Sequence, residues 1–331
     1  SPCTSRFYFL LYILIWSTQG QDLVPPGPIY RAVGEKVLFI TITSPQLSHI
    51  VTWNFMNKNI VTFNPPATEM VDPEYIGRVS LNKTSGALEL SNLIMADSGV
   101  YTVTFTSTDS TSPQQGHISL QVFELVSDVA LIGPEYILIE HNSAQFTCVG
   151  NGTVITTEWM KDNQILAPST RFIFSADNRT LLINPIRRSD SGEYQCTLSN
   201  PVSSNTSNYR MTINYGPNVW IMGTKVVEKD SDVLLLCSSA SRPAATVTWT
   251  VNGMSAGHSP LYVAESSNLS HSGEYICTAW NNVTGLTASA VHFLTVKGKL
   301  SPGAAAGIAA GVIVGVEVLI VILYSLITHF K

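Results

Sequence analysis

The sequence predicts an all-β protein of three tandem two-sheet sandwiches, followed by one transmembrane helix. A short motif occurs three times, as D-S-G-V-Y-T-V from Asp97, D-S-G-E-Y-Q-C from Asp190 and H-S-G-E-Y-I-C from His271. Each copy follows a tryptophan, and these are Trp53, Trp159 and Trp249. The 331 residues are too many for one sandwich and suit three domains of about 100 residues with tails.

The motif has a simple structural meaning. A small polar residue and a Gly make a tight turn, a Tyr enters the next strand, and the residue two positions later points into the same core. In the second and third copies that residue is a Cys, and an earlier Cys precedes each Trp. This is the tyrosine corner of an immunoglobulin sandwich, which predicts the bridges Cys148–Cys196 and Cys237–Cys277.

Composition places the chain outside the cell. Charged residues are only 12% and the net charge is −5, which excludes the electrostatic footprint of a nucleic-acid-binding protein. Paired cysteines behind an apolar leader indicate an oxidising compartment. Six N-x-S/T sequons predict a glycosylated surface, at Asn82, Asn151, Asn178, Asn205, Asn268 and Asn282.

Residues 1–20 have the charged start, short apolar stretch and small residues of a signal peptide. The first domain, 21–124, has the longest separation between its Trp and the residue two after its corner Tyr, which leaves room for an extra edge hairpin and predicts a V-type domain. It lacks the disulfide, because Val103 takes the second Cys position and Ile40 or Thr41 the first. The packing of inward-pointing apolar residues such as Trp53 and Tyr101 must therefore supply the stability that a disulfide would give.

The second and third domains are predicted at 125–216 (I- or C2-type) and 217–296 (C2-type), with a short turn between them at Gly216–Pro217. In the first two domains an Arg precedes the Asp of the motif by the same separation, which predicts two structural ion pairs. These are Arg78 with Asp97 and Arg171 with Asp190. The third domain has His271 in place of the Asp and no Arg before it.

A stalk at 297–302 leads to an apolar run, 303–328, long enough for a transmembrane helix, and 329–331 form a short cytoplasmic end. Four glycines at every fourth position favour lateral association of helices: Gly303, Gly307, Gly311 and Gly315. Glu317 lies near the centre of the run. It indicates either a partner helix with a basic residue or a protonated glutamate that the membrane tolerates without a partner. A glycolipid anchor is a further alternative, because small residues at Ser301–Ala304 precede the apolar tail.

Several stretches resemble the carcinoembryonic-antigen-related cell adhesion molecules. They are the Cys-less D-S-G-V-Y-T-V domain, N-R-T-L-L-I at Asn178, S-N-P-V-S-S at Ser199, Y-G-P-N at Tyr215 and L-S-P-G-A-A-A-G-I before the apolar run. A-W-N-N-V-T-G at Ala279 is also similar to the related hepatocyte cell adhesion molecules. The resemblance implies adhesion between cells through the C-F-G face of the first domain, with itself or a related immunoglobulin protein on adjacent cells. The best-known binders carry Tyr and Gln where this chain has Asn54 and Thr104, which leaves the partner open.

Strand alternation gives the residues of that face. With Trp53 and Tyr101 inward, the outward residues are Ile50, Thr52, Asn54, Thr102, Thr104, Thr106, Ser119 and Gln121. No charged residue is expected there, so two copies would meet without repulsion. The alternative is an ordinary solvated strand surface that binds nothing.

No enzyme, cofactor or metal is predicted, because the histidines are scattered and no nucleophile or phosphate-loop motif is present. The expected location is the plasma membrane, as a single-pass type I glycoprotein. The competing function is an immune-type receptor subunit that signals through a partner helix held by Glu317.

Overall fold

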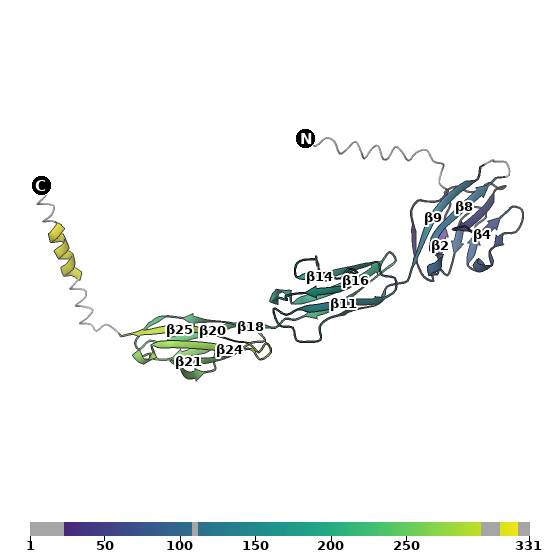
Figure 1. Ribbon diagram of the computed structural model, residues 1–331. Coiled ribbons are helices and arrows are strands. Elements are labelled where there is room, and N and C mark those ends of the chain that lie inside the picture. The colour runs from purple at the N-terminus through teal and green to yellow at the C-terminus, as the bar shows by residue number, and fades with distance from the viewer. Residues whose placement is uncertain (1–22, 108–111, 299–311, 324–331) are drawn as a thin grey trace, which may run out of the picture. The chain divides into compact units, whose positions relative to one another are not determined.

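The computed structural model describes residues 23–107, 112–298 and 312–323. Its strands form pairs of β-sheets, which Figure 1 shows as two layers in each sandwich. The chain divides into two compact units. The first contains the first two sandwiches, except for Glu135–Ala144, Asn184–Ser191 and the residues from Thr212 onward, which belong to the second unit with the third sandwich.

The first sandwich has a large and a small sheet. The large one has the order β1-β9-β8-β3-β4-β5, with β1 (Ile29–Ala32), β3 (Ile50–Phe55), β4 (Lys58–Phe63), β5 (Met70–Val71), β8 (Gly99–Thr106) and β9 (Gln114–Phe123). The small one, β2-β7-β6, has β2 (Val37–Phe39), β6 (Val79–Leu81) and β7 (Leu88–Leu90). Short 3₁₀ turns are η1 (Pro73–Tyr75) and η2 (Met95–Asp97). Strands β4 and β5 form the edge that the longer sequence spacing allows, and β5 is the strand that the sheets of the other two sandwiches lack. Strand β1 runs parallel to β9.

Aromatic residues join the two sheets of this sandwich where the other two have a disulfide. Phe39 from β2 stacks on Tyr101 from β8 at 4.5 Å between ring centroids, and lies 5.6 Å from the ring of Trp53 on β3. All three side chains are fully buried. Their contacts contribute beyond their buried area, since offset and tilted aromatic pairs are favourable.

The second sandwich consists of two four-stranded sheets. One has the order β10-β11-β15-β14, with β10 (Ser127–Ile132), β11 (Ala144–Asn151), β14 (Phe172–Phe174) and β15 (Thr180–Ile183). The other has the order β13-β12-β16-β17, with β12 (Thr156–Lys161), β13 (Gln164–Ile165), β16 (Gly192–Asn200) and β17 (Ser203–Met211). The turn η3 (Arg188–Asp190) precedes β16.

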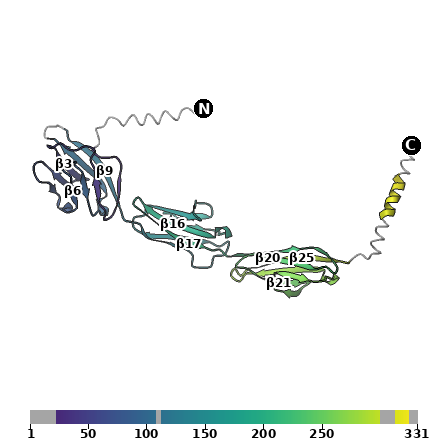
Figure 2. The same ribbon diagram turned by 180° about the vertical axis from the view of Figure 1, so that it is seen from behind.

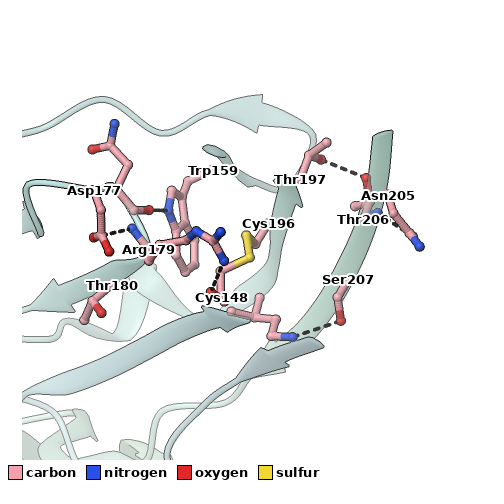
Figure 3. Close-up of a disulfide and its surroundings, with 12 residues drawn as sticks. Cys148, Trp159, Asp177, Arg179, Thr180, Cys196, Thr197, Asn205, Thr206 and Ser207 are labelled. Carbon is pink, nitrogen blue, oxygen red and sulfur yellow. Dashed lines mark hydrogen bonds between the residues drawn. A yellow bond between two sulfur atoms is a disulfide. The ribbon is translucent and has the colours of Figure 1, made fainter. Parts of the chain in front are cut away.

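A disulfide joins these sheets as predicted. Cys148 on β11 is bonded to Cys196 on β16, with their Cα atoms 6.2 Å apart, and Trp159 lies nearby (Figure 3). The Trp159 indole N–H donates to the carbonyl of Asn178 at 2.6 Å, which satisfies its polar atom inside the sandwich.

The third sandwich pairs a three-stranded with a five-stranded sheet. The first has the order β18-β20-β23, with β18 (Tyr215–Gly223), β20 (Val233–Arg242) and β23 (Leu261–Ala264). The second has the order β19-β25-β24-β21-β22, with β19 (Val226–Glu228), β21 (Thr246–Val251), β22 (Met254–Gly257), β24 (Gly273–Trp280) and β25 (Thr287–Lys297). The turn η4 (Leu269–His271) precedes β24, and Figure 2 shows β20, β21 and β25 from the reverse side. The predicted Cys237–Cys277 bridge is present, and β19 runs parallel to β25.

The structure differs from the predicted organisation at Gly216–Pro217 and covers only part of the predicted membrane span. Gly216–Pro217 does not form a separate turn, because both residues lie inside β18 at a shift of register. Residues 312–323 form a helix, but no helix in the part of the chain that the structure describes is long and apolar enough to cross a membrane. Much of the expected span 303–328 lies outside the described residues, as does the predicted leader 1–20, so both stay predictions.

Candidate binding face

The eight residues expected on the C-F-G face lie together on strands β3, β8 and β9. Their outward direction follows from alternation with the buried side chains of Trp53, Tyr101 and Val103. Cross-strand pairs join them, and the pairs are Ile50 with Thr106, Thr52 with Thr104, Asn54 with Thr102 and Val100 with Ser119. The predicted residues therefore form one continuous surface, with Gln121 at its β1 side.

Threonine hydroxyls continue this surface onto β4. The hydroxyl oxygens of Thr52 and Thr62 are 3.4 Å apart, and the side-chain amide of Asn59 donates to the Thr62 hydroxyl at 2.8 Å. Such groups are already paired with each other and still have acceptor capacity. A partner with hydroxyl or amide groups would therefore meet an ordered polar surface.

Sequence reasoning missed five residues of this face, one of which, Asn59, lies opposite Asn54. Gln115 lies opposite Thr104, and His117 lies opposite Thr102 with its Nδ1 atom 2.9 Å from the threonine hydroxyl. Val100 and Thr62 complete the set. Continuing the alternation of β9 back from Ser119 would have identified His117 and Gln115. The face expected to be uncharged therefore carries one ionisable side chain, His117, which is exposed.

The core behind the face is anchored by the small sheet and the turn beside it. The Trp53 indole N–H donates to the carbonyl of Gly86 at 2.8 Å. Gly86 has φ +81°, and a Cβ there would lie 2.7 Å from the Phe105 ring, so only glycine fits without a shift of that ring. These contacts fix Trp53, whose two neighbours in β3, Thr52 and Asn54, belong to the face.

The turn before β8 holds the predicted Arg78–Asp97 ion pair. Asp97 is buried, and it also accepts the backbone N–H of Ile94 at 2.8 Å, while its carbonyl accepts the Tyr101 hydroxyl at 2.9 Å. Burial, with the negative charge of Asp97 second, holds the pKa of Tyr101 well above its usual range. The pair thus orders the turn that leads into the central strand of the face.

The second and third sandwiches vary this turn. Asp190 is buried and accepts the backbone N–H of Arg187 at 2.8 Å, and the Arg171 guanidinium lies over the Phe172 ring at 5.0 Å. An Arg171–Asp190 pair stays a prediction. In the third sandwich, Nδ1 of His271 accepts the backbone N–H of Asn268 at 3.2 Å. His271 therefore keeps the capping role of the aspartates, although it has no arginine partner in the sequence.

The predicted glycosylation sites all have exposed asparagines. Asn82 lies between β6 and β7, on the sheet opposite the candidate face, where its side-chain oxygen accepts the N–H groups of Thr84 and Ser85. The Asn151 amide donates to Asp128, and Asn268 caps η4. None of the six lies on β3, β8 or β9.

The predicted membrane residues are only partly covered by the structure. Gly315 and Glu317 lie on the 312–323 helix, and a Cβ at Gly315 would have no atom within 4 Å. Gly303, Gly307 and Gly311 lie outside the described residues. Among the described residues no group of three or more His, Cys, Asp or Glu is placed to hold a metal ion.

Known proteins are similar to this chain in sequence and fold. The immunoglobulin I-set family model matches residues 134–213. The cell adhesion molecule CEACAM16 of Rattus norvegicus and that of Mus musculus are each 25% identical over 92% of this chain, covering 75% and 74% of their own lengths. The crystal structure of murine CEACAM1b is 27% identical, covers 56% of this chain and 95% of its own, and has a TM-score of 0.51. The mouse nectin-like molecule 4 ectodomain has a TM-score of 0.51 over 82% of this chain and 98% of its own, at 18% identity, which shows the fold alone.

Proposed function

Because the chain is homologous to carcinoembryonic-antigen-related proteins of the immunoglobulin superfamily, we propose that it is an adhesion glycoprotein of the cell surface. It binds a second copy or a related immunoglobulin protein on an adjacent cell through the C-F-G face of its first sandwich. The expected leader, six glycans and single membrane span would place the three sandwiches outside the cell as a type I protein. The relatives themselves are immunoglobulin-type adhesion molecules.

The contrast between the two sheets of the first sandwich carries this proposal. The small sheet has a sequon asparagine, Asn82, beside it. It also has an exposed ion pair between Lys36, which immediately precedes β2, and Glu89 on β7. The large sheet carries neither on β3, β8 and β9, and presents a continuous row of threonine, asparagine and glutamine side chains. A glycan-free surface without fixed charge suits contact with a similar surface, since no unpaired ion is buried.

Contacts of this kind are weak one at a time. A standard interface buries about 800 Å² on each partner. Many copies on two apposed membranes raise the effective concentration of every further contact, so that modest affinity is enough for adhesion.

The experiment uses two matched double substitutions in the full chain. Thr52→Asp with Thr104→Asp places two charges on directly paired residues of the face. Thr248→Asp with Thr278→Asp does the same on the corresponding strands of the third sandwich, where these threonines are also directly paired. Cells without other adhesion molecules are transfected, and their aggregation is measured alone and mixed with untransfected cells.

We expect the first variant to lose aggregation and the second to keep it, at equal surface levels. Buried unpaired charge disfavours the contact only where the contact forms. Equal aggregation of both variants and the unaltered chain would place adhesion elsewhere on the molecule.

A second function rests on Glu317. An acid within an expected membrane span is costly and pairs with a basic residue of a neighbouring helix in many membrane proteins. If an adaptor protein co-purifies with the chain and is lost on Glu317→Leu, the chain acts as a receptor subunit. Replacing Gly307 and Gly311 with Ile tests the separate proposal that the glycines mediate lateral association.

A further inference from the structure

The three-stranded sheet of the third sandwich carries six large apolar side chains on its outer surface. They are Trp220 and Met222 on β18, Leu234 and Leu236 on β20, and Leu261 and Val263 on β23. Met222, Leu236 and Leu261 form one row across all three strands, and Leu234 lies opposite Val263 in the next. We call these six residues the apolar face.

These side chains are not part of the core. Between 38% and 55% of each is exposed, while the alternate residues Val233, Leu235 and Cys237 are buried between the sheets. A sheet with one solvated side normally has polar residues there. On β20 and β23, apolar side chains instead lie on both faces of the sheet.

The apolar face has neither charge nor predicted glycan. The neighbouring outward residues are Asn218, Ser238 and Ala240, and the nearest charged residue on these strands is the exposed Arg242 at the end of β20. The two sequons of this sandwich, Asn268 and Asn282, lie in turns. The opposite sheet differs, because Glu274 lies directly beside Phe293 on its outer surface. The corresponding sheet of the first sandwich carries the Lys36–Glu89 ion pair.

We propose that the apolar face binds the same face of a second copy of this chain. An uncharged apolar surface complements itself, and a two-fold contact of one patch with its copy is the commonest form of association. Six half-exposed large side chains leave on the order of 500 Å² of apolar surface, so that two faces bury about 1,000 Å², near the lower limit for a specific interface. Only residues 298–311 separate β25 from the 312–323 helix. If that helix is part of a membrane span, as proposed above, the third sandwiches of copies in one membrane are tethered by the same short connection and can meet.

The test uses full-length chains labelled with donor or acceptor fluorophores at the C-terminus and co-expressed in isolated cells. Leu236→Glu on every copy places like charges together and should lower the apparent association constant about tenfold or more. Leu236→Lys on every copy should do the same. Mixing one Glu copy with one Lys copy should restore energy transfer, because opposite charges then meet.

A matched control separates this contact from general damage. Phe293→Glu places the same charge on an exposed apolar residue of the opposite sheet and should leave energy transfer unchanged. Cell-surface level and protease resistance report folding for every variant.

Unchanged transfer in both Leu236 variants would overturn the proposal. Loss in both without recovery in the mixture would also overturn it, in favour of a different occupant. Isolated cells exclude contacts between cells, and Thr52→Asp with Thr104→Asp in every chain removes contacts of the adhesive face within one membrane, so the outcome does not depend on that face. A negative result with the Thr52 and Thr104 variants in the aggregation experiment would therefore not contradict the proposal for the apolar face.

Discussion

The first and third sandwiches solve one packing problem with different chemistry. Both bury a tryptophan whose indole N–H donates to a backbone carbonyl, of Gly86 in the first and Ser259 in the third. Both hold the corner tyrosine by a hydroxyl bond to the residue four positions earlier. They differ in the covalent link between sheets. The third sandwich has a disulfide in addition to an aromatic contact between sheets, Tyr262 with Tyr275 at 5.2 Å, whereas the first has the Phe39–Tyr101 stack without a disulfide. The turn, the tryptophan and an aromatic contact between sheets are common to both, and the disulfide is dispensable.

The second sandwich contains both the aromatic stack and the disulfide. Phe146 stacks on Tyr194 at 5.1 Å, as Phe39 does on Tyr101, and it precedes Cys148 by two residues. The equivalent of Cys148 in the first sandwich is therefore Thr41, one of the two positions that the sequence left open. The second sandwich has both links, and the first has the aromatic one without the disulfide.

Phe39→Ala should have the largest effect. Removing a fully buried aromatic that contacts both Trp53 and Tyr101 should cost about 3–5 kcal/mol in free energy of unfolding. Surface expression and protease resistance of the first sandwich report the loss. Leu38→Ala, at a half-exposed neighbour, is the control and should change little. Tolerance of Phe39→Ala would show that the stack is not the link.

Cys237→Ala with Cys277→Ala should come next. The bridge closes a loop with a sequence separation of 40, for which chain entropy gives about 4 kcal/mol, and measured losses run lower in many cases. The denaturant midpoint of the third sandwich should fall while that of the first is unchanged. A reductant should reproduce the shift in the unaltered chain.

Tyr275→Phe should be smaller and should depend on pH. At neutral pH the variant loses the hydroxyl bond to His271, 2.8 Å long, at a cost of about 1 kcal/mol. Burial raises the pKa of Tyr275 to about 12, from an ordinary value of 10.0. The stability from the neutral phenol is thus complete below pH 10 and is lost as pH rises toward 12. Unfolding curves from pH 7 to 12 should show the unaltered chain losing its advantage over Tyr275→Phe across that interval.

The smallest effects concern His271. His271→Ala removes the acceptor for the Asn268 N–H and should cost about 1 kcal/mol, as for other lost caps. His271→Asp restores the residue found in the other two sandwiches and should change stability by less than about 0.5 kcal/mol. An equal loss in both variants would mean that the imidazole contributes through packing rather than as a cap.

The sequence was sufficient where the physics is local. Alternation around Trp53 and Tyr101 predicted the outward residues of β3 and β8, and the Cys spacing predicted both bridges. It failed where pairing between distant strands decides the neighbours. The apolar face appears only when β18, β20 and β23 are aligned. His117 is a different case, because it follows from the alternation of β9, which the prediction did not continue back from Ser119. The capping role of His271 was missed because it depends on a backbone N–H and not on a side-chain partner.

The parallel pairing of β1 with β9, and of β19 with β25, has a mechanical consequence. In each case a strand near the start of the sandwich lies beside the strand that ends it, and both run in the same direction. Tension applied along the chain pulls the two strands past each other, so that their hydrogen bonds are loaded together in shear rather than opened one by one. A protein that connects two cells bears such tension, and resistance to forced unfolding is set by the rate of unfolding rather than by equilibrium stability.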